Sequence, residues 1–439
     1  MRVGGSKRIL LVAGCVLLLA VSWLIAITAQ SDAQRQEELL QQASSYLQDE
    51  IYVRAIPLLE EAASYEDTHT MEAEEVLKDC YLQMIDQSGY EKKYTDLLEK
   101  QMAREDAAPD CFEEAARYYL DQSDLQEALT VLRDGVSKTG SEELETLYEQ
   151  ERYQYQMEDN LFQDVTAIYN GAVQVKKDNH WGLANAAGEI VIPCVYDWIS
   201  TYSNGEAIAK KGAVISGIDG SANRVALHHG EASTFSNFAE NRVGLKTEEG
   251  WLLADGEFNT GSIYFEELGM FSDGGAPAKL DGKWGILDIS GGDWLIAPEY
   301  DGVIQDELGR SYRNDTVFVK SGSQVLLLVD GEQVGESYED ARPFADGWAA
   351  VKKNGTWGFI DQEGVIQIDY QFEDARSFGQ HLAAVKVNGK WGYVSLKGEI
   401  AIEPSYLDAG SFSDGSAPVR TEAGWRFITL LEYEEGTGL

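Results

Sequence analysis

Few residues of this chain have the type and spacing that metal binding requires. His228 and His229 are adjacent, so their side chains would point to opposite faces of a strand. The segment 219–223, DGSAN, resembles the first half of a calcium-binding loop. However, Arg224 stands where that loop needs its turn glycine, and Gly230 stands where it needs its bidentate glutamate. The sequence therefore predicts no metal site.

Motifs for catalysis are also absent from the sequence. The chain has no nucleophile elbow, no phosphate-binding loop, no HExxH and no zinc-type spacing of cysteines and histidines. We therefore expect no catalytic residues and no cofactor, and an enzyme is the least favoured of three functional hypotheses. The residues that bind a partner are not indicated by any motif.

The cysteines allow two interpretations. Cys80 and Cys111 lie 31 residues apart in a helical region, where they could form a disulfide outside the cytoplasm. Each is also explained as a small buried residue. Cys194 follows Pro193 and has no apparent partner.

The most informative stretch is 349–368, AAVKKNGTWGFIDQEGVIQI, which predicts three short strands and two tight turns. Asn354-Gly355 is a hairpin signal, because a type I′ turn needs positive φ at both central positions. Gly364 suits the left-handed position of the second turn. Trp357 offers a large apolar area for burial, and Gly358 would let a neighbouring backbone approach closely.

This stretch recurs along the second part of the chain. The next copy is 383–402, AAVKVNGKWGYVSLKGEIAI, and an aromatic or apolar residue precedes each tryptophan, or its replacement, by 13 residues. The tryptophan positions are Trp181, Ile215, Trp251, Trp284, Val325, Trp357, Trp391 and Trp425, with spacings of 34, 36, 33, 41, 32, 34 and 34 residues. Eight units therefore occupy residues 159–439, and such a period indicates a solenoid, a propeller or an array.

The motif resembles that of the WG-repeat family of bacterial proteins, whose core is G-x-W-G followed by two apolar residues and Asp. The resemblance implies a β-repeat architecture and leaves the ligand open. A closed β-propeller and an open β-solenoid both fit eight such units. The last unit lacks its third strand, and we find no spare strand to close a ring. The tryptophans are expected in the core between units, with ligand-binding tryptophans as the alternative.

Residues 31–158 have helical spacing of apolar residues and resemble the tetratricopeptide pattern, in which small residues let two helices pack closely. Two copies share the same offsets, and a degenerate unit with a turn at 88–90 and Leu98 in its core would lie between them. The two copies are Ala43, Tyr46, Ala55, Leu59 and Ala62, and Ala116, Tyr119, Ala128, Leu132 and Gly135. A generic helical bundle or stalk is the alternative. Residues 150–160 are interpreted as a polar connection.

The N-terminal segment, residues 1–30, is predicted to be a cytoplasmic tip and a transmembrane anchor. Arg2, Lys7 and Arg8 precede a run without charge over residues 9–29, which is long enough to span a bilayer and places the later domains outside the cytoplasm. A cleaved signal peptide is the competing interpretation. Residues 12–15, VAGC, also resemble a lipoprotein signal in which Cys15 would carry the lipid.

The chain is strongly acidic. The 35 basic and 75 acidic residues give a formal net charge of −40, which argues against electrostatic binding to nucleic acid. We expect a multidomain α+β fold with a transmembrane helix, tetratricopeptide-like helices and an all-β repeat array. The favoured function is a membrane-anchored, extracytoplasmic scaffold that binds a protein or peptide. The alternative is a module that binds cell-wall glycan or peptide.

Overall fold

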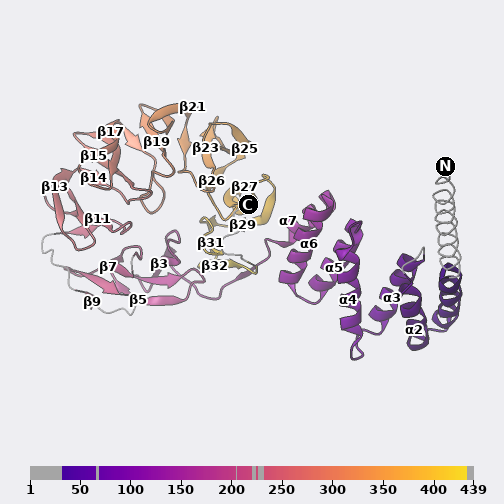
Figure 1. Ribbon diagram of the computed structural model, residues 1–439. Coiled ribbons are helices and arrows are strands. Elements are labelled where there is room, and N and C mark those ends of the chain that lie inside the picture. The colour runs from indigo at the N-terminus through magenta and orange to yellow at the C-terminus, as the bar shows by residue number, and fades with distance from the viewer. Residues whose placement is uncertain (1–31, 66–68, 204, 220–223, 226–231, 433–439) are drawn as a thin grey trace, which may run out of the picture. The chain divides into compact units, whose positions relative to one another are not determined.

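The computed structural model describes residues 32–65, 69–203, 205–219, 224–225 and 232–432 (Figure 1). The chain divides between Tyr148 and Glu149 into a helical unit and a β unit. This boundary lies ten residues before the predicted one at 158. The reason is that residues 155–157, which we interpreted as part of a polar connection, form a strand of the β unit.

The helical unit is a succession of helices joined by short turns (Figure 1). A first helix covers residues 32–48. The others are α2 (Tyr52–Ala63), α3 (Thr70–Gln83), α4 (Tyr90–Ala103), α5 (Pro109–Asp121), α6 (Leu125–Thr139) and α7 (Glu142–Glu151). Gly89, with φ of 92°, precedes α4, as the predicted turn at 88–90 requires.

Small residues permit the close packing of these helices. A Cβ atom on Gly135 of α6 would lie 2.8 Å from side-chain atoms of both Phe112 in α5 and Leu144 in α7. The core positions predicted from the tetratricopeptide-like offsets are largely buried, and those without exposed surface are Ala43, Ala55, Leu59, Ala62, Ala116, Ala128 and Leu132. The predicted pattern of burial is confirmed, and membership of the tetratricopeptide family stays a prediction.

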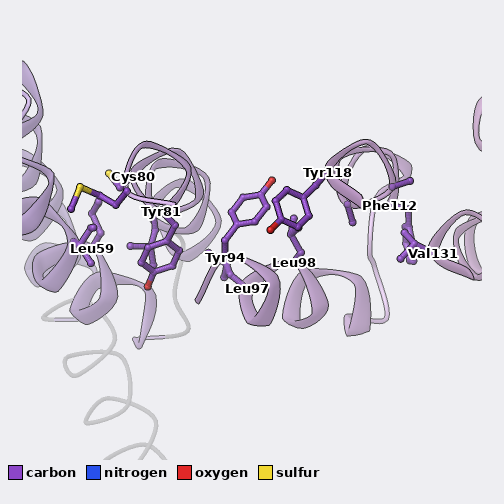
Figure 2. Packing of buried hydrophobic residues seen from close by; sticks show 14 of the residues in the cluster. Leu59, Cys80, Tyr81, Tyr94, Leu97, Leu98, Phe112, Tyr118 and Val131 are labelled. Carbon is purple, nitrogen blue, oxygen red and sulfur yellow. The ribbon is translucent and has the colours of Figure 1, made fainter. Parts of the chain in front are cut away.

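One apolar core runs through the helical unit from the first helix to α7. Figure 2 shows Tyr94 and Tyr118 facing one another from α4 and α5, with ring centroids 4.9 Å apart. Cys80 is buried in the same core. Cys80, Cys111 and Cys194 are all free thiols, so the disulfide that we considered does not form. Burial raises the pKa of Cys80 to about 11.

The β unit consists of eight four-stranded antiparallel sheets, which we call blades 1 to 8. Blade 1 contains β2 (Asp164–Val165), β3 (Ala172–Lys177), β4 (His180–Asn185) and β5 (Ile190–Tyr196), and blade 2 contains β6 (Trp198–Ile199), β7 (Glu206–Lys211), β8 (Val214–Asp219) and β9 (Arg224–Val225). Blade 3 contains β10 (Thr234–Phe235), β11 (Arg242–Lys246), β12 (Trp251–Asp255) and β13 (Thr260–Phe265), and blade 4 contains β14 (Glu267–Leu268), β15 (Gly275–Leu280), β16 (Lys283–Asp288) and β17 (Trp294–Tyr300).

Blades 5 to 8 follow the same order along the chain. Blade 5 contains β18 (Gly302–Val303), β19 (Thr316–Ser321), β20 (Gln324–Val329) and β21 (Glu332–Tyr338), and blade 6 contains β22 (Asp340–Ala341), β23 (Ala349–Lys353), β24 (Thr356–Ile360) and β25 (Ile366–Phe372). Blade 7 contains β26 (Asp374–Gly379), β27 (Leu382–Val387), β28 (Lys390–Ser395) and β29 (Ile400–Tyr406), and blade 8 contains β30 (Asp408–Ala409), β31 (Ser416–Thr421), β32 (Gly424–Leu430) and β1 (Tyr155–Met157). The expectation of three strands per unit is therefore wrong, since most units add a first strand of only two residues.

The eighth blade closes the ring. Its outer strand is β1, which lies more than 250 residues before β32 in the sequence and pairs with Ile428, Thr429 and Leu430. The open β-solenoid is therefore wrong, and so is the statement that no spare strand exists. The fold is a closed eight-bladed β-propeller (Figure 1).

The Trp-Gly pair, which is present in blades 1, 4, 6 and 7, has a clear geometric role. The third and fourth strands change register after the tryptophan, so the fourth strand crosses directly over the glycine. A Cβ atom on Gly358 would lie 2.7 Å from the carbonyl oxygen of Ile368, and one on Gly392 would lie 2.4 Å from that of Ile402. The predicted close approach of a neighbouring backbone is confirmed, and it explains why glycine follows tryptophan.

The transmembrane part of the predicted fold class needs correction. No helix among the described residues is long and apolar enough to cross a bilayer. The span predicted at residues 9–29, with Cys15, lies outside the described residues. The supported fold class is a helical region followed by an eight-bladed propeller.

Candidate functional site

The aromatic-Asp-Gly motif forms a tight turn at the inner end of most blades. In blade 6, Ala345 and Trp348 are bridged across Asp346 and Gly347, whose φ angles are 50° and 79°. Positive φ at both central positions defines a type I′ turn. The same bridge occurs in every blade except blade 7, where β26 itself extends to the turn at Gln380 and His381.

These turns bond one blade to the next. The carboxylate of Asp346 accepts a hydrogen bond of 2.9 Å from the backbone N–H of His381 in blade 7. Four further bonds of this kind exist, in which a side-chain oxygen accepts from a backbone N–H of the next blade. The acceptor and donor residues are Glu240 and Gly274, Asp273 and Asn314, Gln380 and Gly415, and Asp414 and Gly171. The last bond connects blade 8 to blade 1, so the repeated motif also holds the closure of the ring.

Some of the aromatic and tryptophan residues of the repeat are core residues, whereas Trp181, Trp251, Trp284 and Trp425 are half-buried. Phe344, Phe378 and Phe412 are buried, and Trp357 and Trp391 are only 2% and 4% exposed. The Arg342 guanidinium lies 4.4 Å from the centre of the Trp357 ring and also contacts Asp374 of the next blade at 3.4 Å. Burial of Trp357 and Trp391 agrees with the structural role that we expected for the repeat tryptophans.

Blade 5 carries an insertion that enters the centre of the propeller. Its unit is 41 residues long, whereas the others span 32 to 36 residues. The extra residues form a loop at 305–311, which we call the axial loop. The Asp306 carboxylate organises the loop by accepting bonds of 2.9 Å from the N–H groups of Leu308 and Arg310 and one of 2.6 Å from Arg310 Nε.

The axial loop contacts blades on several sides of the ring. The carbonyl oxygen of Gly309 accepts from the N–H of Met270 in blade 4 at 2.9 Å, and that of Leu308 accepts from the side chain of Asn237 in blade 3 at 3.0 Å. Glu307 forms a 2.6 Å ion pair with Arg376 of blade 7. The Arg310 guanidinium lies 5.5 Å from the centre of the Tyr169 ring in blade 1. The loop therefore fills part of the central channel.

A pocket of about 420 Å³, which we call the axial pocket, remains beside the axial loop. It is lined by inner segments of blades 1, 5, 6, 7 and 8, together with Ser272 of blade 4. The lining segments are 167–170, 306–307, 310–313, 342–346, 377–380 and 411–414. This volume suits a side chain or a short extended segment rather than a folded domain.

The pocket offers polar groups rather than reactive ones. Ser377 Oγ donates to the carbonyl oxygen of Pro343 at 2.7 Å, and Ser411 Oγ donates to that of Ser377 at 2.6 Å. Neither hydroxyl is bonded to a base that could activate it. Burial raises the pKa values of Tyr169 and Tyr312, so both phenols stay neutral at ordinary pH. The pocket is therefore suited to binding a ligand through hydrogen bonds.

The residues that the sequence analysis considered and rejected as metal ligands lie mostly outside the described residues. His228, His229 and most of 219–223 lie outside the described residues, and among the residues that the structure does describe there is no cluster able to hold a metal ion. The axial loop and Arg313 were missed from the sequence. The long spacing between Trp284 and Val325 was the only signal for them.

A comparison with known protein families also finds a repeat in this chain. The family described as WG containing repeat matches residues 181–213, 262–284, 337–357, 357–391 and 391–425. The chain contains WG repeats. The matched segments cover less than half of the chain and fall in blades 1 to 8, with blade 5 matched only at its end. A search of curated proteins gave no match.

Several solved structures are similar at low identity. The WD40 domain of SCAP from fission yeast is 8% identical with a TM-score of 0.35, and the match covers 64% of this chain and 98% of that one. The structure of YCF48 bound to D1 peptide is 13% identical with a TM-score of 0.31, covering 64% and 97% of the two chains. The Neurospora crassa Pan2 WD40 domain is 9% identical with a TM-score of 0.34, covering 62% and 90%. The eight-bladed fold follows from the strand pairing of the chain itself.

Proposed function

We propose that the protein is a non-catalytic interaction scaffold whose propeller binds an extended segment of a partner protein in the axial pocket. The observation that carries the proposal is the pocket itself, because segments of five blades and the axial loop converge on one polar space. Its serine hydroxyls and backbone groups match the hydrogen-bonding groups of a peptide chain.

The location of the protein and the absence of catalysis stay predictions. A location outside the cytoplasm rests on residues that the structure does not describe, and the absence of catalysis rests on the polar, unactivated lining. The helical unit would supply a second surface for a partner, as expected for stacked helix pairs.

Site-specific photocrosslinking in intact cells tests the proposal. A photoreactive residue replaces Ser413, which lines the pocket, and in a matched variant it replaces Val365, which is 55% exposed and outside the pocket. We expect one partner segment to crosslink at position 413 and to be absent at position 365. Crosslinking at 365 alone would contradict a partner site at the axis.

The recovered segment then allows a direct binding measurement. As a synthetic peptide it should bind the purified full chain, and Ser411→Trp, which fills the pocket, should abolish binding. Ser405→Trp is the control, because Ser405 is exposed on the outer strand β29. If both variants bind equally well, the segment does not occupy the pocket.

A further inference from the structure

Arg313 is a charged side chain without an ionic partner in the axial pocket. It directly follows the aromatic residue of the blade 5 motif. In the other blades this position holds uncharged residues, namely Tyr169, Ser203, Ala239, Ser272, Ala345, Gly379 and Ser413. The other two arginines of the pocket are paired, Arg310 with Asp306 and Arg342 with Asp340 and Asp374. The Arg313 guanidinium forms no ion pair within the described residues.

Ser311 adds a second unused donor two residues away. It lines the same pocket and is 2% exposed, yet its Oγ atom has no hydrogen-bond partner among the described residues. The serines at the corresponding position of blades 7 and 8, Ser377 and Ser411, both donate to carbonyl oxygens. A buried hydroxyl without a partner is costly, so a ligand that accepts its proton would be stabilised there.

The carboxylates that line the pocket are already occupied. Asp306 accepts from Arg310 and two N–H groups, and Glu307 pairs with Arg376. Asp346 and Asp414 accept backbone N–H groups of the following blade. These four groups leave the Arg313 donors unused. Their charge also disfavours a multiply charged anion, so a singly charged group fits the pocket best.

We propose that Arg313 and Ser311 bind a carboxylate group, the side chain of Glu or Asp, in the partner segment that occupies the pocket. This inference rests on the proposed function. A guanidinium has five N–H donors and no acceptor, and a carboxylate can accept two of these bonds together with the Ser311 hydroxyl. A carboxylate also adds one negative charge, which the Arg313 guanidinium balances, whereas a phosphate adds nearly two.

A peptide library with a fixed central residue tests the assignment on the purified full chain. Four versions carry Glu, Gln, phosphoserine or Lys at the centre, with random flanking residues and blocked ends. We expect the Glu library to be retained about tenfold or more above the Gln library, the ratio for one charge-assisted hydrogen bond. Arg313→Gln and Ser311→Ala should lower the Glu preference, and Arg313→Lys should keep part of it. The control is Arg54→Gln, because Arg54 is an exposed arginine of the helical unit.

Each outcome of the library decides a different point. Equal retention of the Glu and Gln libraries overturns the carboxylate assignment and leaves peptide binding in place. Stronger retention of phosphoserine than of Glu overturns the assignment in favour of phosphate. No retention of any library overturns the proposed peptide site as well. Melting curves of all variants separate loss of binding from loss of folding, and a Glu preference that survives in a folded Arg313→Gln protein also contradicts the proposal.

Discussion

The Tyr406 hydroxyl donates a hydrogen bond of 2.9 Å to the Tyr155 hydroxyl, joining residues that are 251 positions apart. Tyr155 begins β1, so this bond fastens the closing strand of blade 8 to the outer strand β29 of blade 7. The propeller is thus closed by a segment that directly follows the helical unit in the sequence.

Closure predicts that a fragment of residues 149–439 is more stable than one of residues 160–439. The shorter fragment lacks β1, which leaves the edge of β32 unpaired. We expect its melting temperature to be lower by roughly 5–10 °C, measured by circular dichroism.

A point variant gives the same test in the full chain. Gln156→Pro removes a backbone donor within β1 and should lower the melting temperature, whereas Gln156→Ala should leave it nearly unchanged. Equal melting of both fragments and of both variants would mean that β1 does not close the ring.

Trp357 should contribute to stability through its burial between strands and beneath Arg342. Trp357→Ala is expected to cost about 3–5 kcal/mol in the free energy of unfolding, and Trp357→Phe should cost less because it keeps much of the apolar volume. Chemical denaturation of the β unit measures both. If Trp357→Ala unfolds like the parent but loses partner binding, the ring belongs to a binding surface.

Leu308 should anchor the axial loop. It is 4% exposed and packs with Ala239 and Met270 of blades 3 and 4. Leu308→Ala is expected to cost about 2–5 kcal/mol, and Leu407→Ala, at a 41% exposed position, should cost little. Hydrogen exchange at 305–311 should rise in the Leu308 variant alone. Unchanged exchange there would show that the loop does not depend on this contact.

The contacts of Asp301 predict that the stability of the fold decreases at acid pH. Its carboxylate accepts 2.7 Å bonds from Lys283 and from the N–H of Gly322, and these bonds lower its pKa below the ordinary value near 3.8. A group whose pKa is lower in the folded state stabilises the fold above its unfolded pKa, and this stabilisation is lost as the pH falls through the folded pKa.

The comparison of variants isolates this contribution. Between pH 5 and pH 3 we expect Asp301→Asn to lose less stability than the parent, because its amide does not titrate in this range. Asp159→Asn, at an exposed position, should follow the parent curve. A parallel loss of stability in the parent and in Asp301→Asn would mean that these bonds do not act on folding.

The repeat could be predicted from the sequence because its signals are local. Asn354 and Gly355 have the positive φ angles that their types favour, and the glycine of each Trp-Gly pair marks the crossing of the fourth strand. Eight units followed from a single spacing between motif residues.

The remaining features depend on pairing between distant segments. The first strand of most blades has two residues, such as Asp340-Ala341, which is too short to show any periodicity. All three residues of β1 are exposed, so no apolar pattern distinguishes them from a connection. Arg313 becomes a pocket residue only once the ring is closed around the axial loop, and no local signal could indicate that.

Hydrogen exchange of the full chain, with and without the partner segment recovered by crosslinking at position 413, tests the central claim most directly. Binding at the axis predicts slower exchange in 306–313, 377–380 and 411–414, the three segments of blades 5, 7 and 8 that contain pocket-lining residues. The outer strand β5 should exchange as before. Protection confined to outer strands or to the helical unit, with no change in the three axial segments, would contradict the account.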